Sequence, residues 1–317
     1  NTTLAPSTNT TLPSPTTLEI KPYFSKISGA YYDGGVDVEI IKDINNSKES
    51  LYVAMYDFTN KNIKQALIDA HNRGVEVKVV TDDTTIDDDV YVELIESGIE
   101  VIDDANSSKL MHNKFLVVDN EILWSGSGNY TVYAFYRNYE NYVRVKSKEI
   151  AAIYKKEFDY LYTHNNSDYD GGEVKNIEIY FSPDSDFEEK IVELIKESNK
   201  SIEFLAFAFT NYKIAYALVG AKERGVEVKG VMDESQNEFQ TYSVYDDLKE
   251  EGIDVKLSDR KLHSKVFIFD DKIVITGSYN FTKSANDENN ENSLVIYDSN
   301  ISKAYIDNFN FIYQRAQ

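Results

Sequence analysis

Two clusters of histidine, lysine and acidic residues have the composition needed to handle a phosphate. In the first cluster, His112 is followed by Lys114 and then by Asp119. Residues two apart in a strand point to the same face, so the imidazole and the ammonium should aim at one spot. A lysine there supplies positive charge, and a histidine supplies a nucleophile or a proton. This spacing therefore favours phosphoryl chemistry.

Further polar residues follow the first cluster at short intervals. Gly126-Ser127 and Asn129 come after the next expected strand, with their donors spaced to share a face. Glu140 comes next, and we expect its carboxylate to orient the ring of His112 and raise its basicity.

The same pattern recurs once in the second half of the chain. The matching residues are His263, Lys265, Asp270, Ser278, Asn280 and Glu291. Each lies 151 positions after its counterpart, for example 263 minus 112. A single His-x-Lys is a weak signal, but two copies in one register indicate a duplicated unit.

The expected secondary structure repeats as well. Apolar spacing predicts helices over 36–45, 61–73, 90–97 and 187–198. Runs rich in β-branched and aromatic residues predict strands over 51–56, 75–81, 115–118, 122–125, 202–207, 266–269 and 273–276. Alternating helices and strands predict an α/β layered fold.

Composition shifts divide the chain into three parts. Residues 1–19 are rich in Thr and Pro and predict a flexible, disordered tether. Residues 20–165 and 166–317 hold the two repeats, joined by a polar, Gly-rich connector over 163–173. The chain begins with Asn rather than Met, and such tethers commonly follow a signal peptide or an anchor. We therefore expect an extracytoplasmic protein; a cytoplasmic protein with a disordered tail is the alternative.

Cysteine is absent, which excludes disulfides and thiolate chemistry. Histidine occurs four times, and His71 and His164 have no counterpart in the repeat, so we expect both to be solvated bystanders. So few histidines argue against a zinc site, and we expect neither a metal nor another cofactor. No apolar run is long enough to span a bilayer.

The pattern HxKxxxxDxxxxxxGSxN, present twice, resembles the phospholipase D superfamily. The resemblance covers residues 20–312 and includes the Tyr-Phe-Ser segments at 23–25 and 180–182 and the two Arg-Gly-Val-Glu-Val-Lys segments. It implies two similar α/β repeats packed about a pseudo-twofold axis in a layered sandwich, with one shared active site. Both motifs lie in one chain, so a monomer is plausible and no obligate protein partner is expected.

The resemblance also implies a role for each residue of the motif. His112 would attack phosphorus to give a phosphohistidine, and His263 would protonate the leaving oxygen. Phosphate would be bound by Lys114, Lys265, Asn129 and Asn280. Glu140 and Glu291 would orient the imidazoles, whereas Asp119, Asp270, Ser127 and Ser278 would support the motif.

The substrate is less well specified by the sequence. Compact repeats without long insertions most resemble the small nucleases of that family, which implies a metal-independent nuclease acting on DNA or RNA, with single strands preferred. The alternative is a phospholipase D or phosphatidyltransferase acting on phospholipid head groups, and a third hypothesis is a non-catalytic binding protein. A net charge of −21 opposes nucleic-acid binding, as does the acidic segment 82–89, which we expect to be a solvated loop. Local positive charge would come from Lys109, Arg260 and Lys261, and bases would stack on Tyr130, Tyr133, Phe135 or Tyr136.

Overall fold

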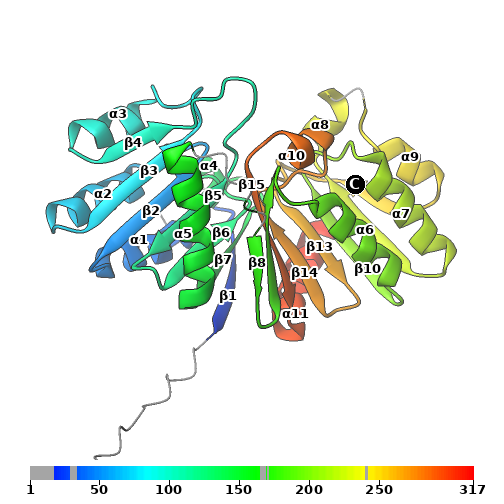
Figure 1. Ribbon diagram of the computed structural model, residues 1–317. Coiled ribbons are helices and arrows are strands. Elements are labelled where there is room, and N and C mark those ends of the chain that lie inside the picture. The colour runs from blue at the N-terminus through cyan, green and yellow to red at the C-terminus, as the bar shows by residue number, and fades with distance from the viewer. Residues whose placement is uncertain (1–17, 29–33, 165–168, 170, 240–241) are drawn as a thin grey trace, which may run out of the picture.

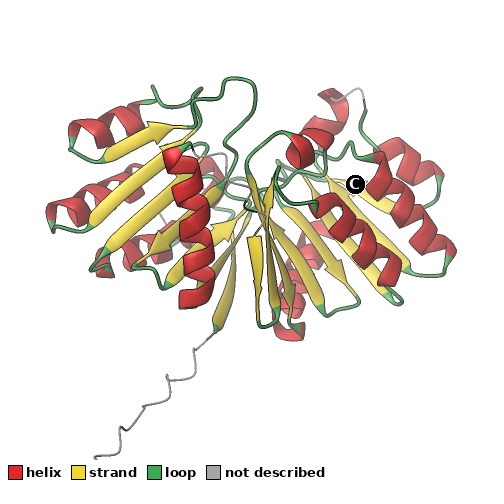
Figure 2. Ribbon diagram, viewed as in Figure 1, coloured by secondary structure: helices red, strands yellow, loops and turns green. Residues whose placement is uncertain are grey.

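The computed structural model describes residues 18–28, 34–164, 169, 171–239 and 242–317. The expected tether over 1–19 lies almost wholly outside the described residues. The rest forms two mixed β-sheets with helices packed against them (Figures 1 and 2). The predicted α/β fold with two similar repeats is confirmed.

The first sheet has seven strands in the order β1-β7-β6-β5-β2-β3-β4. Its strands are β1 (Glu19–Phe24), β2 (Ser50–Met55), β3 (Glu76–Thr81), β4 (Glu100–Asp103), β5 (Lys114–Val118), β6 (Ile122–Gly126) and β7 (Asn141–Lys146). Its helices are α1 (Val36–Asn46), α2 (Lys61–Asn72), α3 (Asp89–Glu96), α4 (Val132–Tyr136) and α5 (Lys148–Thr163).

The second sheet repeats this order and adds one edge strand. Its eight strands run β12-β11-β10-β13-β14-β15-β9-β8, so β9 takes the place of β1 and β13 the place of β5. The strands are β8 (Gly171–Val174), β9 (Ile177–Ser182), β10 (Ser201–Ala206), β11 (Glu227–Met232), β12 (Asp254–Leu257), β13 (Lys265–Phe269), β14 (Ile273–Gly277) and β15 (Glu291–Tyr297). The helices are α6 (Phe187–Glu197), α7 (Tyr212–Glu223), α8 (Glu234–Phe239), α9 (Tyr245–Glu250), α10 (Lys283–Asp287) and α11 (Ser299–Tyr313).

The connector expected over 163–173 extends too far, because its last residues form a strand. Gly171 to Glu173 belong to strand β8, which pairs antiparallel with β9. Glycine-rich sequence disfavours strands in isolation, but here the neighbouring strand supplies the hydrogen-bond partners.

The helix boundaries follow from residues that the two halves share. Asn60 and Asn211 cap α2 and α7, since each side-chain oxygen accepts two backbone N–H groups of the first turn. Gly74 and Gly225 follow these helices with φ of 89° and 93°, a conformation that favours glycine. The predicted helices and strands are confirmed, with ends that shift by at most one residue.

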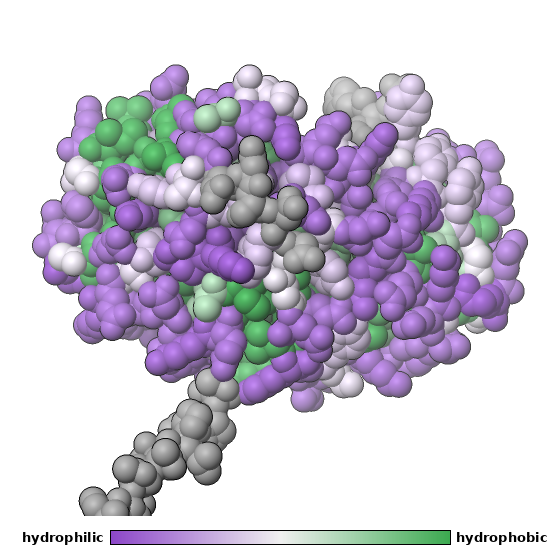
Figure 3. Space-filling view, viewed as in Figure 1, coloured by the Kyte–Doolittle hydropathy of each residue, from purple (hydrophilic) through white to green (hydrophobic). Residues whose placement is uncertain are grey.

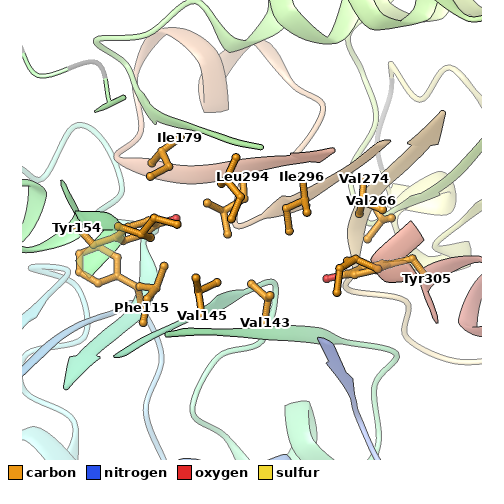
Figure 4. Close-up of a cluster of buried hydrophobic side chains, with 14 of the residues drawn as sticks. Phe115, Val143, Val145, Tyr154, Ile179, Val266, Val274, Leu294, Ile296 and Tyr305 are labelled. Atoms are coloured by element: carbon orange, nitrogen blue, oxygen red, sulfur yellow. The ribbon is translucent and has the colours of Figure 1, made fainter. Parts of the chain in front are cut away.

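The two sheets face each other across the centre of the molecule. Val143 and Val145 of β7 point at Leu294 and Ile296 of β15, and all four side chains are fully buried (Figure 4). Helices α5 and α11 close this central core on either side (Figure 4). Burying each such aliphatic side chain stabilises the fold by about 1.5–3 kcal/mol, so the core joins the halves firmly.

Separate apolar cores lie on the outer faces of the two sheets. Helices α1, α2 and α3 pack against the first sheet there, and α6, α7 and α9 pack against the second. In the described part of the chain, no helix is both long and apolar enough to cross a bilayer.

Candidate active site

Each His-x-Lys motif is attached to the other half of the molecule. His112 and His263 lie just before β5 and β13, which begin at the lysines. The His112 N–H donates to the carbonyl of Asn290 at 2.9 Å, and the His263 N–H donates to the carbonyl of Tyr139 at 2.9 Å. Both motifs therefore meet where the two sheets join.

The carboxylates that contact the two histidines are exchanged between the repeats in the same way. Nδ1 of His112 lies 2.8 and 2.9 Å from the two oxygens of Glu291. Nδ1 of His263 lies 2.9 and 3.0 Å from those of Glu140. The expected pairing of Glu140 with His112 is thus wrong: each glutamate contacts the histidine of the opposite repeat. Sequence spacing favoured a partner in the same repeat, but the docked halves bring the other one closer.

The contacts with glutamate define which ring nitrogen can react. With Nδ1–H donating to a carboxylate, the lone pair of each imidazole lies on Nε2. Burial lowers the pKa of His112, which Glu291 partly offsets. Burial and the charge of Lys265 hold the pKa of His263 well below its ordinary value. Both shifts favour the neutral form of the imidazole in the free protein.

The two motif lysines are buried beside the histidines. Lys114 and Lys265 are 2 % and 1 % exposed. Each Nζ donates to the carbonyl of the histidine two residues earlier, at 2.7 and 2.6 Å. Burial lowers the pKa of Lys114 to about 8 and that of Lys265 to about 7. A buried cation that lacks a full counter-charge is suited to an anionic ligand.

The Gly-Ser pairs support the glutamates. A Cβ on Gly126 would lie 2.3 Å from the carbonyl oxygen of Asn141, so only glycine lets β6 approach β7 this closely. The next residue, Ser127, donates from Oγ to Glu140 at 2.7 Å. Ser278 donates to Glu291 in the same way. The serines thus hold the carboxylates that hold the histidines.

The asparagines of the motif have unused hydrogen-bonding capacity. The Oδ1 atoms of Asn129 and Asn280 are buried and have no hydrogen-bond partner among the described residues. Asn129 also lines a cavity that reaches His263. Each amide oxygen therefore has unused capacity to accept a hydrogen bond.

The motif aspartates lie at the far ends of β5 and β13. Asp119 accepts hydrogen bonds from the backbone N–H groups of Lys48, Glu49 and Ser50. Asp270 does the same for residues 199 to 201. Their contacts lie within the fold, where they join β5 to β2 and β13 to β10.

Two further aspartates position the motifs and were missed by the sequence reasoning. Asp82 accepts the N–H of Met111 at 2.8 Å, and Asp233 accepts the N–H of Leu262 at 2.8 Å. Both carboxylates are buried. Asp82 was expected in a solvated loop, which is wrong. The repeat register contained the signal, because 233 minus 82 is again 151.

The expected stacking residues are mostly part of the core. Tyr130, Phe135 and Tyr136 are at most 2 % exposed, so they cannot meet a base. Tyr133 is 63 % exposed and lines the cavity next to His263. Lys261 lines the same cavity.

Lys109 and Arg260, the other two expected cations, do not line this cavity, and neither does a cluster of three aspartates. Lys109 lines a separate cavity with His164, and the Arg260 guanidinium lies over the Tyr139 ring. Among the described residues, Asp82, Asp83 and Asp104 are close enough to share a cation. None of these aspartates belongs to the repeated motif.

Comparison with known proteins identifies the same two repeats. A family model described as "Cardiolipin synthase, PLD-like domain" matches residues 40–162 and 191–313. A phospholipase D of Rickettsia typhi is 35 % identical over 137 residues, which is 43 % of this chain and 67 % of that protein.

Solved structures extend the comparison. Nuc of Salmonella typhimurium, a phospholipase D family member, is 31 % identical over 44 % of this chain and 95 % of its own, with a TM-score of 0.43. Phosphatidylserine synthase of Haemophilus influenzae matches 93 % of this chain and 86 % of its own at a TM-score of 0.72 and 14 % identity, which shows a common fold. The family model covers most of the sequence and both motifs, and the chain belongs to the phospholipase D superfamily.

Proposed function

We propose that the protein is a metal-independent phosphodiesterase that cleaves nucleic-acid strands through a phosphohistidine intermediate. The observation that carries the proposal is the pair of motif imidazoles, each held at Nδ1 by a buried glutamate of the opposite repeat. Between them, Lys114 and Lys265 supply the charge that a phosphoryl group requires.

The reaction follows from these positions. Nε2 of His112 attacks phosphorus, and the bond from phosphorus to the leaving oxygen breaks. His263 donates its proton to that oxygen. Water then attacks the phosphohistidine and gives a proton to His263, and the P–N bond breaks. Lys114, Lys265, Asn129 and Asn280 would hold the non-bridging oxygens, whose charge increases in the transition state.

The general acid takes up its proton from solvent when the substrate binds. His263 has a strongly lowered pKa, so it is neutral before binding. A phosphodiester carries one negative charge, which favours protonation of a neighbouring imidazole. An acid with a low pKa then gives its proton up readily to the leaving oxygen.

The small apolar area at the cavity favours a nucleic acid over a lipid, although the net charge of −21 opposes a nucleic acid. The face in Figure 3 is largely hydrophilic. Of the large apolar side chains that are exposed in the described part of the chain, Tyr133 alone lines the cavity beside His263. A lipid-binding mouth needs a contiguous apolar rim, whereas one exposed aromatic ring suits a base.

A diester with a good leaving group separates the roles of the histidines. p-Nitrophenolate leaves without protonation, so His263→Ala should still release one equivalent from bis(p-nitrophenyl) phosphate in a burst. His112→Ala should release none, and His71→Ala should turn over normally. A burst from His112→Ala and none from His263→Ala would reverse the roles.

Substrate class is tested in parallel with single-stranded DNA, RNA and phosphatidylcholine vesicles in EDTA. We expect cleavage of the nucleic acids that both His112→Ala and His263→Ala abolish. Cleavage of lipid without cleavage of nucleic acid would refute the proposed substrate and leave the phosphodiesterase chemistry intact.

A further inference from the structure

The two halves are alike around the histidines but differ on one side of the site. At equivalent positions, the first repeat has Asp57 where the second has Ala208. The second repeat has Lys261 where the first has Leu110. Because the halves face each other, these two changes fall on the same side, next to His263. A symmetric phosphate site does not require this asymmetry.

The unequal residues line a cavity of about 390 Å³. That volume is typical of a site for one small ligand group. The lining of the cavity includes Asp57, Asn129, Tyr133, Lys261 and His263. It therefore opens beside the general acid, where the leaving half of a diester would lie.

Asp57 is the acceptor in this cavity. Its carboxylate is half-buried and forms no hydrogen bond or ion pair with any of the described residues. Burial and the nearby Asp88 raise its pKa, whereas Lys114 and Lys261 lower it. A half-buried carboxylate without donors is costly, and a ligand with N–H groups would relieve that cost.

Tyr133 and Lys261 supply the other two kinds of contact. The Tyr133 ring is 63 % exposed at the edge of the cavity, and its equivalent in the second repeat is Ser284. An exposed ring of this kind stacks on a nucleobase. Lys261 forms no ion pair with the described residues and lies over the ring of Phe207. Its ammonium is available to the phosphate of the leaving nucleotide.

We propose that this cavity is a nucleobase subsite that favours guanine next to the scissile phosphate, with Asp57 as the specificity-determining residue. Guanine presents two neighbouring donors, N1–H and the N2 amino group, which a carboxylate accepts together. Thymine presents one donor between two carbonyl oxygens, and those oxygens would face the carboxylate unfavourably. The inference rests on the proposed nuclease function and adds the base that the site selects.

Cleavage mapping on designed strands tests the subsite. The strands are thymine tracts with one internal guanine, hypoxanthine, adenine or cytosine, and the products are resolved on a denaturing gel. We expect cleavage beside guanine to exceed cleavage at thymine by about tenfold, as for a good bidentate base contact. Hypoxanthine lacks the N2 amino group and should lose much of this preference.

Each variant is judged by the ratio of cleavage at guanine to cleavage at thymine within one reaction. This ratio does not depend on the total activity of the variant. Asp57→Ala copies the residue of the second repeat and should reduce the guanine-to-thymine ratio to about one. Asp57→Asn, which has one acceptor and one donor, should lower the ratio and change the preferred base. Asp307→Asn, an exposed change on α11, should leave both ratio and rate unchanged.

Two results would overturn the inference, and they differ in what else they refute. Equal cleavage at all bases by the wild type would refute the subsite but leave the nuclease intact. Cleavage of phosphatidylethanolamine but of no strand, lost in Asp57→Ala, would assign Asp57 to an amine head group. That second result would refute the nuclease as well.

Discussion

The contacts of each histidine with the glutamate of the opposite repeat lead to a prediction that differs from the one made by sequence spacing, which pairs each histidine with the glutamate of its own repeat. Replacing Glu291 by Gln keeps the shape but removes the charge that faces Nδ1 of His112. A hydrogen bond to a charged group contributes about 1.5–3 kcal/mol. At 1.36 kcal/mol per pH unit, the pKa of His112 should fall by about one to two pH units. The pKa of His263 should change little, because its carboxylate partner is Glu140.

Imidazole resonances measured by ¹⁵N-edited NMR during a pH titration give both pKa values directly. The chain has four histidines, so His71→Ala and His164→Ala identify the signals of those two residues, and the signal that His112→Ala removes from the remaining pair belongs to His112. Glu140→Gln is the matched control and should lower the pKa of His263 instead. The crossed assignment fails if Glu291→Gln moves His263 rather than His112. Either variant should also slow phosphodiester cleavage, by a factor on the order of a hundred to ten thousand.

Four further predictions follow from the charges of the site and the fold. Sulfate should inhibit less as the pH rises, because Lys265 and Lys114, with pKa values of about 7 and about 8, lose their protons; inhibition constants that do not vary with pH would contradict this. Dialysis against EDTA should leave the rate unchanged, and recovery of a lost rate on adding a divalent cation would refute the metal-independent mechanism. Asp82→Asn should lower the free energy of unfolding by about 1.5–3 kcal/mol, since the N–H of Met111 loses a charged acceptor; an unchanged denaturation midpoint would exclude that role. Partial burial alone would raise the pKa of Asp270, but the hydrogen bonds from backbone N–H groups lower it more, so the folded-state pKa lies below its ordinary value. The ionised carboxylate therefore stabilises the fold above the unfolded-state pKa of about 3.9, and this stabilisation is lost as the pH falls through the folded-state pKa. Asp270→Asn should therefore lower the Tm at neutral pH and not in strong acid.

Much of the fold could be predicted because the duplication repeats every local signal. The constant spacing of 151 residues is enough to identify equivalent histidines, lysines and asparagines in the two halves. Periodicity located the main helices and strands because apolar residues alternate with the geometry of each element. Strand β8 escaped prediction because its glycines carry no such pattern.

The parts of the site that depend on docking could not be predicted. Sequence distance makes Glu140 the natural partner of His112, and only the packing of β7 against β15 brings Glu291 there instead. The role of the aromatic residues after Gly126-Ser127 could not be predicted either. Their composition fits both a core and a base platform, and burial left only Tyr133 exposed.

The exchange of glutamates between the repeats means that neither repeat contains a complete catalytic unit. A single copy would have its histidine without the carboxylate that orients it, and would need a second copy to supply that group. Joining the copies in one chain makes their encounter intramolecular, so assembly of the site does not depend on protein concentration. It also allows the sequences of the two copies to diverge independently. Two identical subunits must carry every substitution twice, whereas a fused pair can place an aspartate on one side of the phosphate and an alanine on the other.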